Sequence, residues 1–350
     1  MLTLPASDYH DPDVHRLERA AIFAREWLCI GSAASVADAG TFLADTVAGW
    51  PIVVVRDQTG HLRAFHNVCR HRAGPLVDDG PGTCRTFVCR YHGWSYGLDG
   101  ALRSARDSGL DASDLVGLDL LEVRVATWRG LLFVGLEPSL PALEDWLSPA
   151  FIAQCADFPM EAWTPSTRAT HALACNWKTY SDNYLEGYHI PYVHPSLARA
   201  LDMTTYGVTV HEGWARHDAR TRNGAATAGV WLYHWPNLAL NLYEDGMSVE
   251  RWFPTSPVGC TLVLDYVFAV PSDAASSANQ QAVDASTVTC LEDKAICEAV
   301  QRNLEAGAYA DGVLAPRHEA AVVDFQERVR GARAAHERTA TATLSRPSPA

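Results

Sequence analysis

The chain has 350 residues, of which 48% are hydrophobic, so it is long enough for two domains that each bury a core. Its formal net charge of −13 argues against the basic surface that binds nucleic acid or an anionic membrane, and we expect neither partner. The N-terminus lacks a secretion signal, no later stretch reaches membrane-spanning length without a charge, and nine scattered cysteines fit a reducing compartment. These features predict a cytoplasmic protein that acts on small molecules.

The first part of the chain is expected to form a helix followed by short strands. Apolar residues recur with helical spacing from residue 12 to residue 27, after the helix-starting sequence Asp-Pro-Asp. From about residue 40 to residue 135 the pattern changes to short apolar runs between glycine-containing turns, which indicates an antiparallel barrel or sandwich. The expected strands are 52–56, 62–65, 85–88, 131–134 and a short one at Tyr96.

Two cysteine–histidine pairs lie inside this β-rich region. Cys69 and His71 are separated by one residue, and Cys89 and His92 by two, with Gly-Trp after the last ligand. A Rieske [2Fe–2S] cluster takes two thiolates on one iron and two neutral imidazoles on the other, so two facing loops of this kind would supply the full set. The alternative is a zinc site, but zinc loops tend to repeat one ligand type within a pair. The order of ligands therefore favours the iron–sulfur cluster.

The second half of the chain has a different order of elements. A proline-bearing stretch marks a domain boundary near residue 138, and a helix is expected over 176–189. After it we expect a meander of longer antiparallel strands at 229–235, 238–243, 247–253 and 260–270, a polar loop at 272–281, and helices at 284–304 and 316–333.

These patterns predict two domains and a tail. The first covers 1–138, with the initial helix and the cluster loops at 67–97, and the second covers 139–338. The tail 339–350 is rich in Thr, Ser, Ala and Pro and is expected to be disordered.

A second group of metal ligands lies at the end of the helix expected over 176–189. Glu186 precedes His189 by one helical turn, and His194 follows His189 by five residues. Pro191 is expected to interrupt the helix so that the two rings lie side by side. Two histidines and one carboxylate on one face of iron(II) leave positions for dioxygen and substrate. Without the upstream motif, structural or surface histidines would be the better interpretation.

Together the motifs resemble the terminal oxygenase (alpha) subunits of the Rieske non-heme iron oxygenases. The resemblance rests on Asn67 to Arg72, on Cys89 to Trp94 and on the pattern from Glu186 to His194, so it involves both halves of the chain. Glutamate at position 186, where many members have aspartate, is similar to the choline, carnitine and betaine monooxygenase-like group. Arg90 stands where proline is common in the family, and we expect it to loosen the loop or to add positive charge without removing a ligand.

The resemblance implies an α+β fold and two cofactors. An N-terminal antiparallel β domain would hold the [2Fe–2S] cluster, and a C-terminal helix-grip domain, an antiparallel sheet with helices, would hold Fe(2+). It also points to Asp293 as the third iron ligand, with Glu292 and Asp324 as alternatives. A simpler reading of Asp293 is an exposed acid that the helix dipole favours in a first turn.

The resemblance further implies that Glu186 does not bind iron but connects His189 to His92 of a neighbouring subunit. Electrons from a flavin- or ferredoxin-type reductase would then cross a subunit boundary to the mononuclear iron. A head-to-tail contact of this kind must close into a ring, most simply a homotrimer.

The implied function is a terminal oxygenase that uses reductase-supplied electrons and O2 to hydroxylate or N-demethylate a small organic substrate. Aromatic side chains on the expected strands are candidate pocket walls: Trp231, Tyr233, Trp235 and Tyr243. Such walls bind a quaternary ammonium group by cation–π attraction, although large aromatics on a sheet are more often core residues. They would also accept an aromatic acid, so a ring-hydroxylating or O-demethylating oxygenase is the alternative.

Two interpretations from other classes remain at this point. A non-catalytic Rieske electron carrier would need only the first domain. A helix-grip ligand-binding protein with a zinc-stabilised accessory domain would use the four Cys and His side chains for structure.

Overall fold

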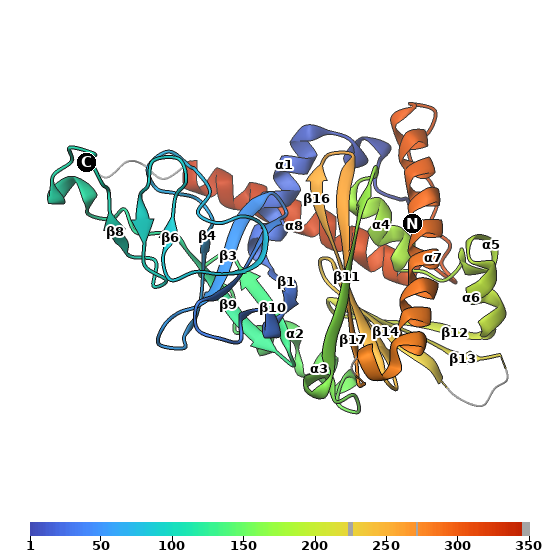
Figure 1. Ribbon diagram of the computed structural model, residues 1–350. Helices are drawn as coiled ribbons and strands as arrows, with labels where there is room; N and C mark the ends of the chain where they lie inside the picture. Colours follow the sequence, from blue (N-terminus) through green and yellow to red (C-terminus); the bar gives the residue numbers. More distant parts are fainter. Residues whose placement is uncertain (223–226, 271, 345–350) are drawn as a thin grey trace. The chain divides into compact units, whose positions relative to one another are not determined.

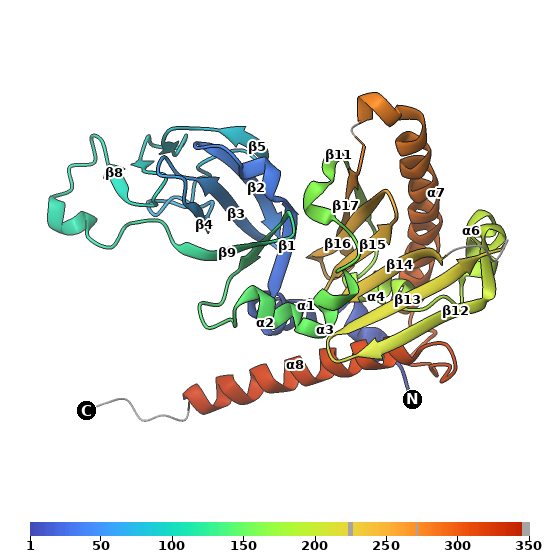
Figure 2. The same ribbon diagram turned by 90° about the horizontal axis from the view of Figure 1, so that it is seen from below.

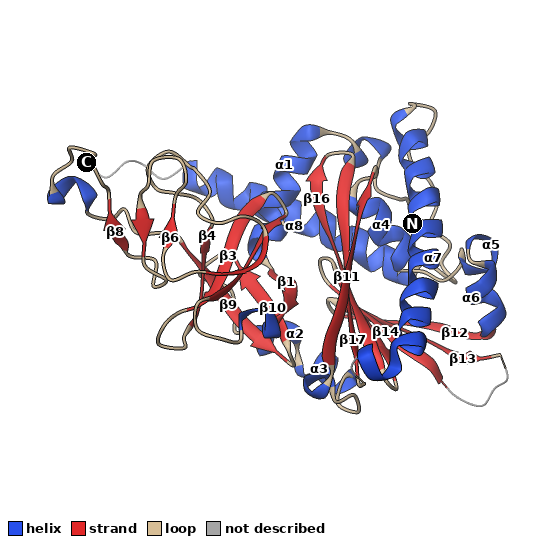
Figure 3. Cartoon of the chain, viewed as in Figure 1, coloured by secondary structure: helices blue, strands red, loops and turns tan. Residues whose placement is uncertain are grey.

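The computed structural model describes residues 1–222, 227–270 and 272–344. The chain divides into a small unit, Arg25–Trp146, and a large unit, which joins Met1–Ala24 to Leu147–Ala350. Each unit contains an antiparallel sheet of seven strands, and the helices are concentrated in the large unit. Figure 3 shows this distribution. The predicted α+β fold with an antiparallel sheet in each half is confirmed.

The first 24 residues fold with the large unit, which differs from the expected domain of 1–138. Helix α1 (Pro12–Ala21) contacts α8 (Ala320–Leu344). Its Glu18 is buried and accepts hydrogen bonds from Lys178 Nζ at 2.7 Å and from Trp177 Nε1 at 3.0 Å. A buried carboxylate needs such partners, so α1 is held by residues far along the chain.

The second boundary lies after Trp146 instead of near residue 138. The indole of Trp146 donates a hydrogen bond to Glu26 Oε2 at 2.6 Å and lies edge-on to Phe133. These contacts hold residues 139–146 in the small unit. The proline-bearing stretch near residue 138 contains no strand, but it is not the boundary between the units.

The strands of the small unit are β1 (Trp27–Ser32), β2 (Thr41–Val47), β3 (Trp50–Arg56), β4 (Leu62–His66), β5 (Gly80–Thr83), β6 (Phe87–Val88), β7 (Ser95–Tyr96), β8 (Leu102–Ser104), β9 (Glu122–Trp128) and β10 (Leu131–Gly135). The larger sheet has the order β1-β10-β9-β4-β3-β2-β5, and the smaller sheet the order β6-β7-β8. Short 3₁₀ helices lie at Ala33–Val36 and Ala112–Leu115, and α2 (Leu143–Leu147) spans the boundary.

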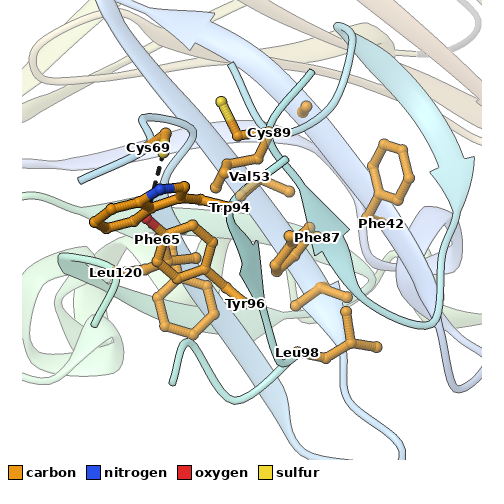
Figure 4. Close-up of a cluster of buried hydrophobic side chains, with 13 residues drawn as sticks. Phe42, Val53, Phe65, Cys69, Phe87, Cys89, Trp94, Tyr96, Leu98 and Leu120 are labelled. Atoms are coloured by element: carbon orange, nitrogen blue, oxygen red, sulfur yellow. Dashed lines mark hydrogen bonds between the residues drawn. The ribbon is translucent and has the colours of Figure 1, made fainter. Parts of the chain in front are cut away.

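The core of the small unit includes two of the predicted ligands. Cys69 and Cys89 are buried together with Phe65, Phe87 and other apolar side chains from both sheets. Figure 4 shows Trp94 and Tyr96 in the same packed group. The hydrophobic core therefore fixes the positions of both thiols.

The strands of the large unit are β11 (Thr164–Leu173), β12 (Leu201–His211), β13 (Trp214–Thr221), β14 (Thr227–His234), β15 (Leu238–Tyr243), β16 (Gly246–Ser256) and β17 (Gly259–Phe268). Its helices, besides α1, α2 and α8, are α3 (Pro149–Gln154), α4 (Trp177–Tyr184), α5 (Ile190–Val193), α6 (Pro195–Ala200) and α7 (Ser272–Glu305), with 3₁₀ helices at Ala6–Tyr9, Phe23–Arg25 and Met160–Ala162. Phe23–Arg25 crosses the boundary between the units.

The sheet of the large unit is a meander from β12 to β17, and β11 pairs with β17 at its far edge. Helix α7 contacts β11, β17 and α4, and Figures 1 and 2 show it running beside these elements. Side chains of adjacent strands form a row that passes through Trp231, Asn241, Ser248 and Tyr266. This row becomes one wall of the site described below.

Three strands and one helical segment differ from the sequence expectations. Strands β11, β12 and β13 lack the strong apolar alternation that identifies a strand. Strands β11 and β12 lie at sheet edges and are largely exposed or half-buried, and β13 is an interior strand whose buried positions include His217 and two alanines. The prediction of a polar loop over 272–281 was wrong, since α7 begins at Ser272. The segment is rich in alanine, a strong helix former, and α7 continues through it.

The ends of the chain also differ from expectation. Helix α8 continues to Leu344, so residues 339–344 are helical, while the rest of the expected disordered tail lies outside the described residues. In the part of the chain that the structure describes, we find no helix long and apolar enough to cross a bilayer.

Candidate metal centres

The two cysteine–histidine loops have the same backbone closure. The amide of Cys69 donates to the Gly74 carbonyl at 2.8 Å, and the amide of Ala73 donates back to Cys69 at 3.0 Å. In the second loop the amide of Cys89 donates to Trp94 at 2.8 Å, and that of Gly93 donates to Cys89 at 2.9 Å. The fourth residue after each cysteine has a positive φ, +53° and +75° respectively. The chain therefore builds two equivalent turns, each with one thiol and one imidazole.

The four side chains divide by exposure. The Cys69 and Cys89 side chains point into the core at 3% and 2% exposure, whereas His71 and His92 are exposed. The two imidazole rings lie 4.6 Å apart between centroids. Two sulfurs on the inside and two nitrogens on the outside form the donor set of a Rieske cluster, and this set fits the group.

Two further features adapt these loops to a cluster. A Cβ atom at Gly74 would lie 2.8 Å from Cys89 Sγ, so only glycine leaves room for the sulfur. The Tyr96 hydroxyl accepts a hydrogen bond from the Arg70 amide at 3.1 Å and lies 3.3 Å from Cys69 Sγ. With its oxygen engaged by the amide, the hydroxyl is oriented to donate to the sulfur.

Arg90, which stands where proline is common in the family, pairs with an acidic side chain and not with a cluster ligand. Its guanidinium pairs with Asp78, with distances of 3.0 Å and 2.8 Å to the two carboxylate oxygens. Both side chains are more than 70% exposed, so the pair neutralises the added charge but contributes little stability.

The large unit brings three predicted iron ligands together. The Nε2 atoms of His189 and His194 lie 3.1 Å apart, and Asp293 Oδ1 lies 3.0 Å from His194 Nε2 and 3.6 Å from His189 Nε2. Among the described residues they form the one group of His, Cys, Asp or Glu side chains with this metal-ligand spacing. Imidazole nitrogens bind divalent metals at about 2.1 Å, so two at right angles lie about 3 Å apart. The donor set is therefore suited to Fe(II).

The far nitrogens of both rings carry carboxylate partners. Glu186 Oε1 lies 2.5 Å from His189 Nδ1, and Glu292 Oε2 lies 2.8 Å from His194 Nδ1. Such partners select the tautomer that leaves Nε2 free for a metal and hold the ring in place. The structure thus places Glu292 beside the site as a hydrogen-bond partner, and Asp293 among the three converging side chains.

Two other residues bear on the predicted iron site: one that the prediction missed, and one that it offered as an alternative ligand. Asn183, which the sequence analysis missed, lies in the last turn of α4 and donates to Asp293 Oδ1 at 2.6 Å. Its place three residues before Glu186 in the expected helix was the available signal. Asp324 instead pairs with Arg328 on α8 at 2.7 Å.

The local explanation for the His189–His194 contact needs correction. Helix α4 ends at Tyr184, so the expected helix over 176–189 stops before Glu186. Pro191 then lies in the first turn of α5, where its missing N–H costs nothing, and does not interrupt a helix. The single turn of α5 brings the rings together, with His189 at its N-cap and His194 at its C-cap.

A cavity of about 450 Å³ opens beside these three side chains. Its walls come from α4, the sheet and α7, and they include aromatic side chains from several elements: Tyr180, Tyr184, Tyr206, Trp231, Tyr243, Tyr266 and Phe268. A volume of this size suits a small organic molecule.

Two of the four predicted pocket aromatics line this cavity. Trp231 and Tyr243 do so, and the indole of Trp231 donates to the Tyr243 hydroxyl at 3.1 Å. Tyr233 on β14 and Trp235, which follows that strand, pack against Phe325 of α8 and are not among the described residues that line the cavity. Alternation gives the face of the sheet, whereas the covering helix decides which part of that face stays open.

Burial shifts the pKa values of two polar groups in the cavity wall. It raises the pKa of Glu250 to about 7, and it lowers the pKa of His217 to about 4. His217 is therefore neutral at pH 7, with Nδ1 2.9 Å from the Tyr206 hydroxyl. Neither residue was predicted, since a single Glu or His within a strand carries no sequence signal.

Comparison with known proteins agrees with both units. Residues 26–118 match the Rieske [2Fe-2S] domain, and residues 160–234 and 207–334 match the ring hydroxylating alpha subunit (catalytic domain). The chain is 33% identical to choline monooxygenase of Beta vulgaris over 89% of this chain and 72% of the relative. It is 29% identical to the carnitine monooxygenase oxygenase subunit of Escherichia coli K12, over 88% and 85%.

Among solved structures, the quaternary ammonium Rieske monooxygenase CntA in complex with L-carnitine superimposes with a TM-score of 0.82 at 25% identity. The match covers 95% of this chain and 96% of that one.

Proposed function

We propose that this chain, which belongs to the Rieske non-heme iron oxygenases as an alpha-type terminal oxygenase, oxidises a small methylated ammonium compound. As a member of this family, the protein is an oxidoreductase with a [2Fe–2S] cluster and a mononuclear iron, and it takes electrons from a partner protein. The observation that carries the substrate class is the aromatic cavity beside His189, His194 and Asp293. Aromatic faces attract a quaternary ammonium group, and the relatives named above act on choline and carnitine.

Each metal centre has a proposed set of ligands. Cys69, Cys89, His71 and His92 would hold the cluster, and His189, His194 and Asp293 would hold the iron. When bound, these groups supply the electrons and the dioxygen activation for a monooxygenation, in which O2, two electrons and two protons convert a substrate C–H bond to C–OH and release water. If the hydroxylated carbon is an N-methyl group, loss of formaldehyde completes an N-demethylation.

The protein's own residues position these reactants. Glu186 and Glu292 fix the two imidazoles through their Nδ1 atoms. The cavity aromatics hold the methylated nitrogen beside the ligand group and replace water around it. We propose that Glu186 also connects His189 to His92 of a neighbouring subunit, because His92 is exposed on its own unit and is free to meet another chain.

This role of Glu186 requires an oligomer, for which we propose a homotrimer. The electron donor would be a flavin- or ferredoxin-type reductase. The cysteine content of the sequence suits a cytoplasmic location.

Metal and sulfide analysis tests the site assignments. Purified protein should contain about three irons and about two acid-labile sulfides per chain, two irons in the cluster and one outside it. Zinc without sulfide would instead support a ligand-binding protein with a structural zinc site.

A single-turnover experiment tests the substrate class without knowledge of the reductase. Chemically reduced protein is mixed with oxygen and with choline, carnitine or benzoate, and products are identified by mass spectrometry. We expect oxidation of a methylated ammonium compound. Oxidation of benzoate alone would establish the aromatic-acid alternative, and reoxidation without any product would indicate an electron carrier.

A further inference from the structure

A buried carboxylate faces the cavity without a positively charged partner. Glu250 on β16 is 6% exposed and lines the cavity. Its Oε1 accepts a hydrogen bond from Asn241 Nδ2 at 2.7 Å, and its Oε2 accepts one from the Tyr180 hydroxyl at 3.3 Å. Within the described ranges, no Lys, Arg or His nitrogen lies within 4.0 Å of it. Both donors are neutral, so they orient the carboxylate but do not balance its charge.

Burying a carboxylate in this way is unfavourable unless a cation offsets it. Loss of hydration penalises the ionised form, and burial accordingly raises the pKa of Glu250 to about 7. A substrate cation that enters the cavity would restore the ionised form. Because a quaternary ammonium group has no N–H to donate, it needs charge and aromatic faces alone, and the cavity offers both.

The described wall of the cavity offers no cationic side chain to balance a substrate anion. No Lys or Arg is found among its described lining residues. His189 and His194 are assigned to iron, and burial lowers the pKa of His217 to about 4, so its ring is neutral. A substrate carboxylate would therefore lose its hydration without a cationic side chain to pair with, and the charge of the iron beside the cavity would already be partly neutralised by Asp293.

We propose that Glu250 is the counter-ion for the substrate and that the cavity selects molecules with a net positive charge and no carboxylate. This inference rests on the proposed function and narrows it: among methylated ammonium compounds, choline-like cations bind and zwitterionic betaines are rejected. Glu250 acts here as a specificity-determining residue and takes no part in the reaction at the metal.

Three probes of similar size separate charge from shape. Choline is the cation, 3,3-dimethylbutan-1-ol is its neutral isostere with carbon in place of nitrogen, and glycine betaine is the zwitterion. Calorimetric titration of the oxidised holoenzyme should show choline binding about 10- to 100-fold more tightly than either of the others. Glycine betaine binding as tightly as choline would overturn the proposal while leaving the proposed function intact.

The variant Glu250→Gln keeps the volume and one acceptor oxygen but removes the charge. Its affinity for choline should fall about 10- to 100-fold, while its affinity for the neutral isostere should change less than about twofold. Unchanged choline affinity would refute the role of Glu250. If Glu250→Gln fails to retain its metals, Glu250→Asp replaces it in the experiment. This variant keeps the charge on a shorter side chain, so its affinity for choline should be lower than that of the wild type but still higher than its affinity for the neutral isostere.

Asp245→Asn is the matched control. Asp245 also lines the cavity but is exposed in the turn before β16, where water screens its charge. Its loss should lower choline affinity less than about threefold. Equal effects of both variants would mean that the general negative charge of the cavity, and not Glu250, selects the substrate. If no ammonium compound binds and benzoate does, the proposed function itself fails.

Discussion

The two metal sites place their ligands in opposite surroundings. Among the cluster ligands the histidines are exposed and the cysteines are buried. At the iron site His194 and Asp293 are 1% and 8% exposed and face a cavity. An exposed imidazole suits electron exchange with another protein, whereas a buried site suits chemistry from which water must be kept away.

The sites also differ in how the chain assembles them. The cluster ligands lie between residues 69 and 92, on two turns with the same hydrogen bonds. The iron ligands come from the two ends of α5 and from α7, about a hundred residues later. Changes at the first site should therefore act locally, and changes at the second should depend on how α7 packs.

The largest expected effect separates the two sites completely. Cys89→Ser removes a thiolate from the cluster, so visible absorption should disappear and iron should fall by about two per chain. The mononuclear iron should remain, because its ligands are in the other unit. Absorption spectra with metal analysis give both readings, and wild-type absorption would contradict the cluster assignment.

His194→Ala is the reciprocal control. It should leave visible absorption intact and remove the single iron and turnover. Simultaneous loss of both centres in either variant would show that the sites are not independent.

The next effect concerns the carboxylate supplied by α7. Asp293→Ala removes the one anionic donor of the three converging side chains, and we expect iron affinity to fall at least about tenfold. Asp324→Ala, which breaks only a half-exposed pair with Arg328, should keep normal iron content. Iron analysis after dialysis against a weak chelator distinguishes them. Loss of iron in the Asp324 variant alone would transfer the role to that residue.

These differences explain how much the sequence could predict. The cluster ligands are close in sequence, so their spacing identified them, and His189 and His194 were identified from their spacing together with that upstream motif. Asp293 depended on family resemblance, because nothing local separates it from its neighbour Glu292. Glu250 and Asn183 were not found, since their roles arise from how α4, α7 and the sheet meet.

The fold shows the same division between local and long-range information. Apolar alternation predicted the central strands β14 to β17, which are largely buried. It did not identify the polar edge strands β11 and β12. The helix expected over 12–27 was assigned to the first domain, whereas α1 folds with the large unit. The sequence near α1 contains no sign that Glu18 would meet Lys178.

A third prediction tests whether the two sites communicate through Glu186. Glu186→Gln keeps the side-chain volume but cannot accept N–H bonds from two imidazoles with the same strength. Both centres should assemble, yet reduced protein mixed with oxygen and substrate should reoxidise its cluster at least about tenfold more slowly. Stopped-flow absorption at the cluster bands measures this rate.

Glu292→Gln is the matched control for that experiment. Glu292 contacts His194 as Glu186 contacts His189, but it has no proposed bridging role. It should leave cluster reoxidation close to the wild-type rate. If both variants slow electron transfer equally, the effect comes from ring orientation, and the bridge through Glu186 is refuted.

The smallest expected effect is a change in the potential of the cluster without any loss of metal. Tyr96→Phe removes the hydroxyl that lies 3.3 Å from Cys69 Sγ. A hydrogen bond to sulfur stabilises the reduced, more negative cluster, so its removal should lower the midpoint potential by about 40 mV, which corresponds to about 1 kcal/mol. Spectroelectrochemical titration measures the shift.

Tyr91→Phe supplies the control for this deletion, because Tyr91 lies beside His92 but is 55% exposed. Its potential should shift by less than about 10 mV, since water replaces an exposed hydroxyl at little cost. Equal shifts would mean that the cluster responds to general polarity instead of to one bond. A selective shift at Tyr96 would show that the buried, sulfur-bearing side of the cluster sets its potential, while the exposed imidazoles remain available for electron exchange.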